Sequence, residues 1–387
     1  MTYTPANNVF ILGAGASVHA RVPVMRNFIR AAEDVMAYNG EKEEFADDFR
    51  NVFEAISLLR PSYATSKMDL NNIEDLFGVM EMGVIVSRLG TQTDKAKIIG
   101  YRDSLRRVIV RTIEHTMRFQ GTPKVRLRSS EQYALLADTI INHAQSNHPY
   151  KTSSVITFNY DCGMDIAFEY RSDGTSEDID YGLDDNRSGY RLLKLHGSIN
   201  WATEFGADKS GPIHVLPIAA QGSQRALITY QVPDRVGLSY LHGLRRGRYH
   251  AYTGEMKQLD LDPVIVPPTW SKGEHQSRIS KVWELAAKDL AGAQNIFIIG
   301  YSLPETDSFF RHLMSLGTST DVSRRRFWVF DPDKSGSVKG RYKRIIGDGV
   351  SDARYFPMKF DNAAISLIQA ALKNEPGDPK GEFEWFL

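Results

Sequence analysis

Short apolar runs that each end at a glycine or a polar residue constrain the fold of this 387-residue chain more than any other feature. The first run, Val9–Leu12, is continuous and ends at Gly13. Continuous apolar runs of this length are typical of parallel strands that are buried on both faces of a sheet. Further runs of the same form recur along the chain at Ser154–Thr157, Leu192–Leu195, Val264–Val266, Asn295–Ile299 and Phe327–Phe330.

Stretches with apolar residues at helical spacing lie between several of these runs, for example Ser277–Leu290 and Ser308–Met314. Strands that alternate with helices predict an α/β fold with a doubly wound, parallel, Rossmann-like sheet. In such folds ligands bind beyond the carboxyl ends of the strands. We therefore expect the functional residues where the apolar runs end.

The chain between the first two predicted strands shows only helical periodicity. This predicts a large helical insertion over residues 27–144, within a sheet domain formed by residues 1–26 and 145–372. Residues 172–188 are rich in Asp, Gly and Ser and predict an irregular loop, and residues 201–253 predict an excursion between two sheet strands. The expected helices of the insertion are Asn27–Met36, Ile73–Val86, Lys97–Met117 and Glu131–Ile141.

Residues 373–387 combine a linker containing proline and glycine with a final segment that holds three aromatic residues. Such a tail either docks on its own domain or covers a neighbouring molecule. The sequence leaves both interpretations open.

Charge and composition exclude few classes of function. The chain has 47 basic and 47 acidic residues, and nothing in this balance requires a nucleic-acid or membrane partner. Basic clusters such as Arg106–Arg107 and Arg324–Arg326 are interpreted either as solvated faces or as anion sites. No apolar run approaches the roughly 18 residues of a membrane-spanning helix, so we expect a soluble, cytoplasmic protein. With one cysteine, Cys162, the chain cannot form an intrachain disulfide or a zinc site with several cysteine ligands.

The first predicted strand ends in the sequence GAGAS, residues Gly13–Ser17. Glycines after a buried strand allow a tight turn and a close approach to a phosphate group. The dinucleotide fingerprint is incomplete, because Val18 replaces its third glycine and no acidic residue ends a second strand about 20 residues later. A hydride-transferring dehydrogenase is therefore not indicated, and a simple strand-to-helix turn stays an alternative.

Two further strand ends carry side chains suited to catalysis. Asn159 and Asp161 follow one strand, where they either bind a ligand or form a capping turn that opens the next helix. His196 follows another strand, and an imidazole with an ordinary pKa near 6.5 is the usual proton acceptor at neutral pH. An isolated histidine is more often a surface or core residue, so the case for His196 depends on the other motifs.

Taken in order, GAGAS at 13–17, TFNYD at 157–161, KLHGS at 194–198 and GYS at 300–302 resemble the motifs of the sirtuin family, and in particular its bacterial sirtuin-like domains. Pro23 and Arg26 stand at the spacing of the family's proline and arginine. The resemblance covers residues 9–26 and about 154–331, and it implies a sirtuin-type sheet that binds NAD+. Phe158 and Tyr160 depart from the family, which has Gln and Ile there, and Val24 and Met25 replace its Asp and Phe.

The resemblance also implies residue roles. The catalytic residues would be His196 as general base, Asn159 to position the nucleophile and the ribose, and Asp161 to hold the nicotinamide side. For Asp331 an alternative is that it only caps residues 332–333. The NAD+-binding residues would be Gly13, Ala14, Gly15, Ser17, Pro23, Arg26, Thr157, Phe158, Gly197, Ser198, Gly300, Ser302 and Asp331.

Sirtuin deacetylases carry a zinc ribbon built from four cysteines, which this chain cannot supply. The resemblance therefore implies no zinc and a NAD+ glycohydrolase that cleaves its substrate NAD+ to nicotinamide and ADP-ribose. It implies an abortive-infection effector of anti-phage defence, a homo-oligomer controlled by self-assembly or by a HerA-type ATPase partner, with nucleic acid reached only through that partner. The alternatives are a non-enzymatic sensor of NAD+ or ADP-ribose, and a protein deacylase or ADP-ribosyltransferase.

Overall fold

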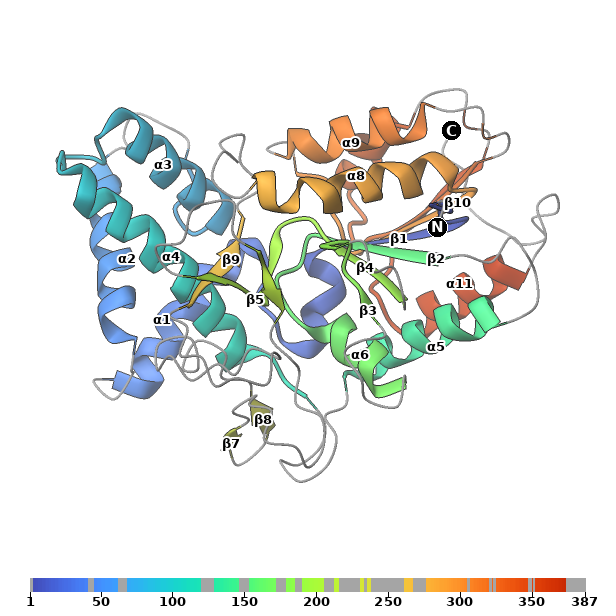
Figure 1. The fold of residues 1–387 in the computed structure, drawn as a ribbon, viewed down its shortest axis with the longest axis horizontal. Coiled ribbons are helices and arrows are strands. Elements are labelled where there is room, and N and C mark those ends of the chain that lie inside the picture. Colours follow the sequence, from blue (N-terminus) through green and yellow to red (C-terminus); the bar gives the residue numbers. More distant parts are fainter. Residues whose placement is uncertain are drawn as a thin grey trace. The chain divides into compact units, whose positions relative to one another are not determined.

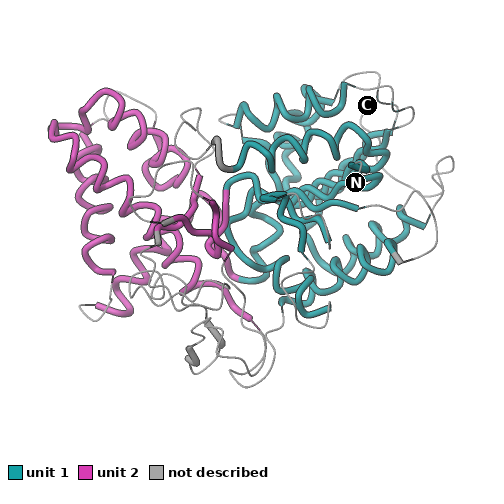
Figure 2. Tube along the Cα trace, viewed as in Figure 1, with its two compact units in different colours: residues 1–20, 127–196, 277–387 teal, residues 21–126, 197–276 magenta. Residues whose placement is uncertain are grey.

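The structure is a computed structural model, and its chain divides into two compact units (Figure 2). Unit 1 comprises residues 1–20, 127–196 and 277–387, and unit 2 comprises residues 21–126 and 197–276. The structure describes residues 3–40, 45–61, 68–119, 129–145, 153–171, 179–184, 190–204, 212–215, 230–232, 235–237, 261–266, 276–304, 307–319, 322, 325–346, 350 and 352–373.

Unit 1 is built on a seven-stranded parallel sheet with the strand order β12-β11-β10-β1-β2-β4-β3. Every residue of β1 and β10 is buried, as the continuous apolar runs require. The predicted α/β, Rossmann-like fold class is confirmed. The strands are β1 (Asn8–Leu12), β2 (Ser153–Thr157), β3 (Ile179–Asp180), β4 (Tyr190–Lys194), β10 (Asn295–Ile299), β11 (Arg326–Phe330) and β12 (Asp352–Phe356).

The central strand β1 marks the point where the sheet changes direction. From β1 the chain builds outward through β2 and β4, and later returns to the other side of β1 through β10, β11 and β12. Leu12, the last residue of β1, pairs with Thr157 of β2 and Ile299 of β10. The three strands therefore end level with one another, at the edge where doubly wound sheets bind their ligands.

Helices cover both faces of this sheet. Figure 1 shows α8 and α9 on one face and α5, α6 and α11 on the other, and α5 packs against both α6 and α11. The turn after β1 continues as the short 3₁₀ helix η1 (Ala14–Ala20). The helices are α5 (Glu131–Gln145), α6 (Gly163–Arg171), α8 (Gln276–Gly292), α9 (Ser308–Thr318), α10 (Ser337–Lys343) and α11 (Asn362–Lys373).

Unit 2 is organised around the long helix α4 (Lys95–Thr116), which packs against α1 (Phe28–Asn39), α2 (Ala46–Leu59), α3 (Ile73–Val86) and β9 (Leu261–Ile265). Both α3 and α4 begin at an N-cap whose side chain accepts a backbone N–H. The remaining elements are η2 (Met25–Asn27), β5 (Gly197–Glu204), β6 (His214–Val215), β7 (Tyr230–Val232) and β8 (Arg235–Gly237).

The basic cluster predicted at Arg106–Arg107 is part of an ion-pair network in unit 2. Arg106 is buried and lies 3.2 Å from the carboxylate of Glu81, and Arg107 lies 2.9 Å from the carboxylate of Asp48. Paired guanidinium groups of this kind are structural. The cluster at Arg106–Arg107 is therefore neither a solvated face nor an anion site, the two interpretations drawn from the sequence.

One predicted strand of the parallel sheet is wrong. The run Val264–Val266 falls largely in β9, which pairs antiparallel with β5 in a separate three-stranded sheet. Burial alone makes a strand apolar, whichever sheet it joins. The irregular loop expected at 172–188 contains the edge strand β3, and α2 and β12 were not predicted.

The compact units do not follow the domain boundaries expected from the sequence. Helix α5 belongs to unit 1, and residues 197–276 join the helical block in unit 2. The boundaries at 26 and 144 stay a prediction, and the aromatic tail at 374–387 lies outside the described residues. Among the helices of the described ranges, none has the length and apolar character needed to cross a membrane.

Candidate active site

Asn159 is held at the carboxyl end of β2 by three hydrogen bonds. Its side-chain nitrogen Nδ2 donates to the carbonyl of Gly13 and to the hydroxyl of Ser17, both at 2.9 Å, and its backbone N–H donates to Thr157 Oγ1 at 3.1 Å. The side chain is buried, yet Asn159 Oδ1 has no hydrogen-bond partner among the described residues. A buried acceptor without a protein partner is available to a ligand or a water molecule.

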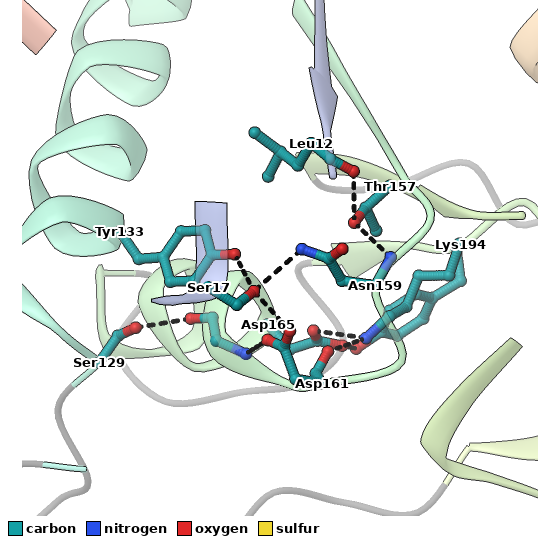
Figure 3. A network of polar contacts seen from close by, with 11 residues as sticks. Leu12, Ser17, Ser129, Tyr133, Thr157, Asn159, Asp161, Asp165 and Lys194 are labelled. Atoms are coloured by element: carbon teal, nitrogen blue, oxygen red, sulfur yellow. Dashed lines mark hydrogen bonds and ion pairs between the residues drawn. The ribbon is translucent and has the colours of Figure 1, made fainter. Parts of the chain in front are cut away.

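The hydroxyl of Ser17 connects Asn159 to two further groups. Ser17 Oγ lies 2.6 Å from Asp161 Oδ2 and 2.7 Å from the phenolic oxygen of Tyr133 (Figure 3). All four side chains are buried, and they come from η1, the β2–α6 loop and α5. Tyr133 was not predicted, because only its apolar periodicity in α5 is visible in the sequence.

The carboxylate of Asp161 is hydrogen-bonded to other groups of unit 1. Its Oδ1 accepts the backbone N–H of Gly163 at 2.8 Å, so the capping turn expected as an alternative is confirmed. Burial raises the pKa of Asp161, while the Ser17 hydroxyl and the Lys194 ammonium group counteract the rise. Both carboxylate oxygens of Asp161 are thus engaged with protein groups, and a role on the nicotinamide side stays a prediction.

Lys194, the last residue of β4, is a buried cation behind this loop. Its Nζ donates to the carbonyl of Asp161 at 2.7 Å and to Asp165 Oδ2 at 2.8 Å, and the hydroxyl of Tyr181 donates to Asp165 Oδ1 at 2.7 Å. Burial by itself lowers the pKa of Lys194, but Asp165 and the other negative groups nearby together offset this, and the pKa lies above its ordinary value. The ammonium group stays charged and anchors the loop that carries Asn159.

His196 follows β4 and is buried against aromatic rings of unit 1. The centroid of its ring lies 5.1 Å from that of Phe158, 6.2 Å from that of Tyr160 and 6.4 Å from that of Trp283. Phe158 in turn stacks on Tyr301 at 4.8 Å. The imidazole therefore lies beside the two residues that flank Asn159 in the sequence.

The glycines after β1 pack against the turn that follows β10. The N–H of Gly15 donates to the carbonyl of Gly300 at 2.8 Å, and a Cβ placed on Gly13 would lie 2.6 Å from the same carbonyl oxygen. The amides of Gly13 and Ala16 also donate to carbonyls. This close contact explains the glycines without a ligand, and phosphate binding by Gly13, Ala14 and Gly15 stays a prediction.

Other predicted binding residues of unit 1 lie at the same strand ends. Thr157 Oγ1 donates to the carbonyl of Leu12 at 3.3 Å. Ser302 is exposed, and its carbonyl accepts Arg341 Nε at 2.9 Å. Asp331 Oδ1 accepts the N–H of Asp333 at 2.9 Å, so Asp331 makes the capping contact, and its role in NAD+ binding stays a prediction.

Four predicted binding residues belong to unit 2. Pro23 precedes η2, Arg26 lies within η2, and Gly197 and Ser198 open β5. Gly197 pairs with Ile265 of β9, and a Cβ placed on it would lie 2.1 Å from the carbonyl oxygen of Val264. The contribution of these four residues to NAD+ binding stays a prediction.

His19 in η1 gives a pH-dependent prediction. It contacts the rings of Tyr133 and Phe360 at 5.0 and 5.7 Å, and burial lowers its pKa from 6.5 to about 4. A neutral, half-buried histidine stabilises the fold above pH 6.5, and this contribution is lost as the pH falls toward 4 because the unfolded chain binds the proton more tightly. Allowing for partial exposure, we expect His19 to account for about 1–2 kcal/mol of lost unfolding free energy between pH 7 and 5.

Urea unfolding at pH 7 and pH 5 checks this expectation. The pH-dependent loss should shrink in His19→Gln and persist in His312→Gln, which changes an exposed histidine on α9. An identical pH dependence in wild type and His19→Gln would contradict it.

The chain is similar to known proteins only among solved structures. No protein-family model matches the chain, and no curated protein matches it in sequence. Among similar structures is Sir2 in complex with the inhibitor EX-527, 2'-O-acetyl-ADP-ribose and a deacetylated p53 peptide, with 11% identity and a TM-score of 0.37 over 95% of this chain and 92% of that one. Another is Sir2 with a p53 peptide and NAD+, with 10% identity and a TM-score of 0.36 over 95% and 94% of the two chains.

A mutant Sir2 homologue in complex with ADP-ribose is also similar, with 9% identity and a TM-score of 0.39 over 95% of this chain and 91% of that one. Likeness at these identities and TM-scores decides nothing about function. Among the described residues, no group of three or more His, Cys, Asp or Glu side chains is placed to hold a metal ion.

Proposed function

We propose that this protein is a NAD+ glycohydrolase, which cleaves NAD+ to nicotinamide and ADP-ribose. The observation that carries the proposal is the buried Asn159 amide at the end of β2, tied to the turn after β1 and with Oδ1 left as an acceptor. His196 follows the neighbouring strand β4 and lies beside Phe158 and Tyr160. The ordered motifs that resemble those of sirtuins supply the substrate class.

Cleavage of the nicotinamide glycosidic bond passes through a ribose with oxocarbenium character. The electron pair of the breaking C–N bond goes to the nicotinamide ring, and a water oxygen then bonds to the anomeric carbon. In this proposal His196 accepts the proton of that water, or acts through a ribose hydroxyl, and Asn159 Oδ1 accepts a hydrogen bond from the water or the ribose.

Hydrolysis is favoured over lysine deacylation because the chain has one cysteine and so lacks the four-cysteine ribbon of sirtuin deacetylases. A role as an abortive-infection effector in anti-phage defence, assembly into a homo-oligomer and control by a HerA-type ATPase are part of the same proposal. They rest on the motif resemblance alone.

The test is incubation of the purified protein with NAD+, with and without a candidate ATPase partner, and measurement of nicotinamide and ADP-ribose. We expect His196→Ala and Asn159→Ala each to lower the rate of nicotinamide release about 100-fold or more, since each removes a group that contacts the reacting atoms. His312→Ala, an exposed histidine on α9, is the matched control and should keep the wild-type rate.

Other outcomes would select a different function. Undiminished release in both variants would refute the assignment of the site. A wild-type protein that binds NAD+ but releases nothing under any partner condition would be a sensor, and NAD+-dependent removal of an acetyl group from an acetyl-lysine peptide would identify a deacylase. The mass of the protein in solution, measured by light scattering, tests the proposed homo-oligomer.

A further inference from the structure

We propose that Tyr133 is a positioning residue that holds the Asn159 amide in one orientation through the hydroxyl of Ser17. The catalytic consequence rests on the proposed function, whereas the effect on the Asn159 side chain does not. Tyr133 lies in α5, outside every motif that resembles the sirtuin family. Its phenolic oxygen lies 2.7 Å from Ser17 Oγ.

The hydrogen-bonding capacity of Ser17 Oγ is completely used. A serine hydroxyl has one hydrogen to donate and two lone pairs that accept, and Ser17 has three polar neighbours, Asn159 Nδ2, Asp161 Oδ2 and Tyr133 (Figure 3). If Asp161 is ionised, Ser17 donates to it and accepts from Tyr133. If Asp161 is protonated, the two bonds reverse. In both cases the three neighbours fill all three positions, so a ligand can reach Ser17 Oγ only by displacing one of them.

The same count fixes the amide of Asn159. Both hydrogens of Nδ2 are taken, one by the Gly13 carbonyl and one by Ser17 Oγ. A flipped amide would bring Oδ1 against the Gly13 carbonyl, and two acceptors repel each other. Oδ1 is therefore the atom of Asn159 that remains available to a ligand, and its direction depends on Ser17 staying in place.

Tyr133 is itself held firmly enough to fix Ser17. A Cβ placed on Gly163 would lie 2.5 Å from the Tyr133 ring, so the glycine at the start of α6 makes room for that ring. His19 packs against the ring at a centroid distance of 5.0 Å. Burial raises the pKa of Tyr133 well above its ordinary value, so the hydroxyl keeps its hydrogen throughout the neutral range. Without that hydroxyl, Ser17 Oγ keeps its bonds to Asp161 and Asn159 but has one unfilled position, so its orientation, and with it that of the Asn159 amide, is less firmly fixed.

The experiment compares Tyr133→Phe, Ser17→Ala and the double variant in the nicotinamide-release assay, with crystal structures of the wild type and Tyr133→Phe. We expect kcat to fall about tenfold in Tyr133→Phe and about 100-fold in Ser17→Ala, with KM changed less than about threefold. Because Tyr133 acts through Ser17, the double variant should match Ser17→Ala. The crystal structure of Tyr133→Phe should show the Asn159 amide displaced or in two orientations.

Tyr342→Phe is the control for loss of a buried phenol, because the Tyr342 hydroxyl donates to the backbone carbonyl of Tyr301 instead of to Ser17. It should keep the wild-type kcat. Multiplying effects of Tyr133→Phe and Ser17→Ala, a rise in KM without a fall in kcat, or an unmoved Asn159 amide in Tyr133→Phe would each overturn the inference. If the wild type releases no nicotinamide, the proposed function fails, and the crystal structures still decide the role of Tyr133.

Discussion

Replacing Gly300 with alanine is expected to lower the free energy of unfolding by about 3–5 kcal/mol. Gly300 follows β10 at a φ of +61°, in the left-handed region that L-residues rarely adopt. A Cβ there would lie 2.3 Å from the backbone nitrogen of Ala16 and 2.5 Å from the carbonyl carbon of Gly15. Because both are backbone atoms, no side-chain rotation relieves the contact.

A matched variant separates the clash from the backbone conformation. Gly336 has a φ of +81°, and a Cβ placed on it meets no atom within 4 Å. Gly336→Ala should therefore lose only about 1 kcal/mol, the usual cost of a positive φ without the glycine. Urea unfolding of both variants is the measurement, and equal losses in the two would contradict the tight packing between the turns that follow β1 and β10.

The Gly300 substitution also bears on the proposed active site. Gly15 donates to the Gly300 carbonyl, and Gly13, two residues earlier, accepts from Asn159 Nδ2. Displacing the turn after β1 therefore moves one of the two acceptors that orient the Asn159 amide. A folded Gly300→Ala protein at low temperature should release nicotinamide more slowly than Gly336→Ala does.

The sequence predicts those strands of the sheet well that are apolar because they are buried. The runs at β1, β2 and β10 are apolar because each lies between two neighbouring strands and under helices, and their ends correctly bring Gly13 and Asn159 to one edge. β12 has no such run. Its Arg354 is buried, with the guanidinium group 4.8 Å from the ring of Trp328 and Nε donating to Asp352, and a search for apolar residues cannot detect such a strand.

The polar network of the site was predictable only in part. Asn159 and Asp161 are visible in the sequence because they follow a strand, and Ser17 because it closes a glycine turn. Tyr133 and Lys194 are not, since each looks like an ordinary member of its own helix or strand, and their contacts depend on segments far apart in the sequence. Long-range contacts between buried polar groups leave no periodicity, so only the fold reveals them.

Replacing Lys194 with methionine is expected to lower the free energy of unfolding by about 3–5 kcal/mol, because it leaves the buried carboxylate of Asp165 without its cation. Lys194 and Asp165 are both almost fully buried, and their ion pair measures 2.8 Å. Methionine has nearly the same length, so the loss measures charge and hydrogen bonding and not a cavity. Lys288→Met, which breaks an exposed ion pair with Glu284 on α8, should change stability by less than about 0.5 kcal/mol.

Replacing the unpaired Asp165 carboxylate as well should recover much of the lost free energy of unfolding. In Lys194→Met combined with Asp165→Asn, the new amide stays neutral and still accepts the hydroxyl of Tyr181, so we expect the double variant to regain about half of the lost free energy. The carbonyl of Asp161 would still lack its donor, since Lys194 Nζ bonds it directly. Nicotinamide release should therefore stay impaired although stability improves, because the loop that carries Asn159 remains unanchored. A double variant less stable than Lys194→Met alone would show that the buried pair does not stabilise the fold through its charges.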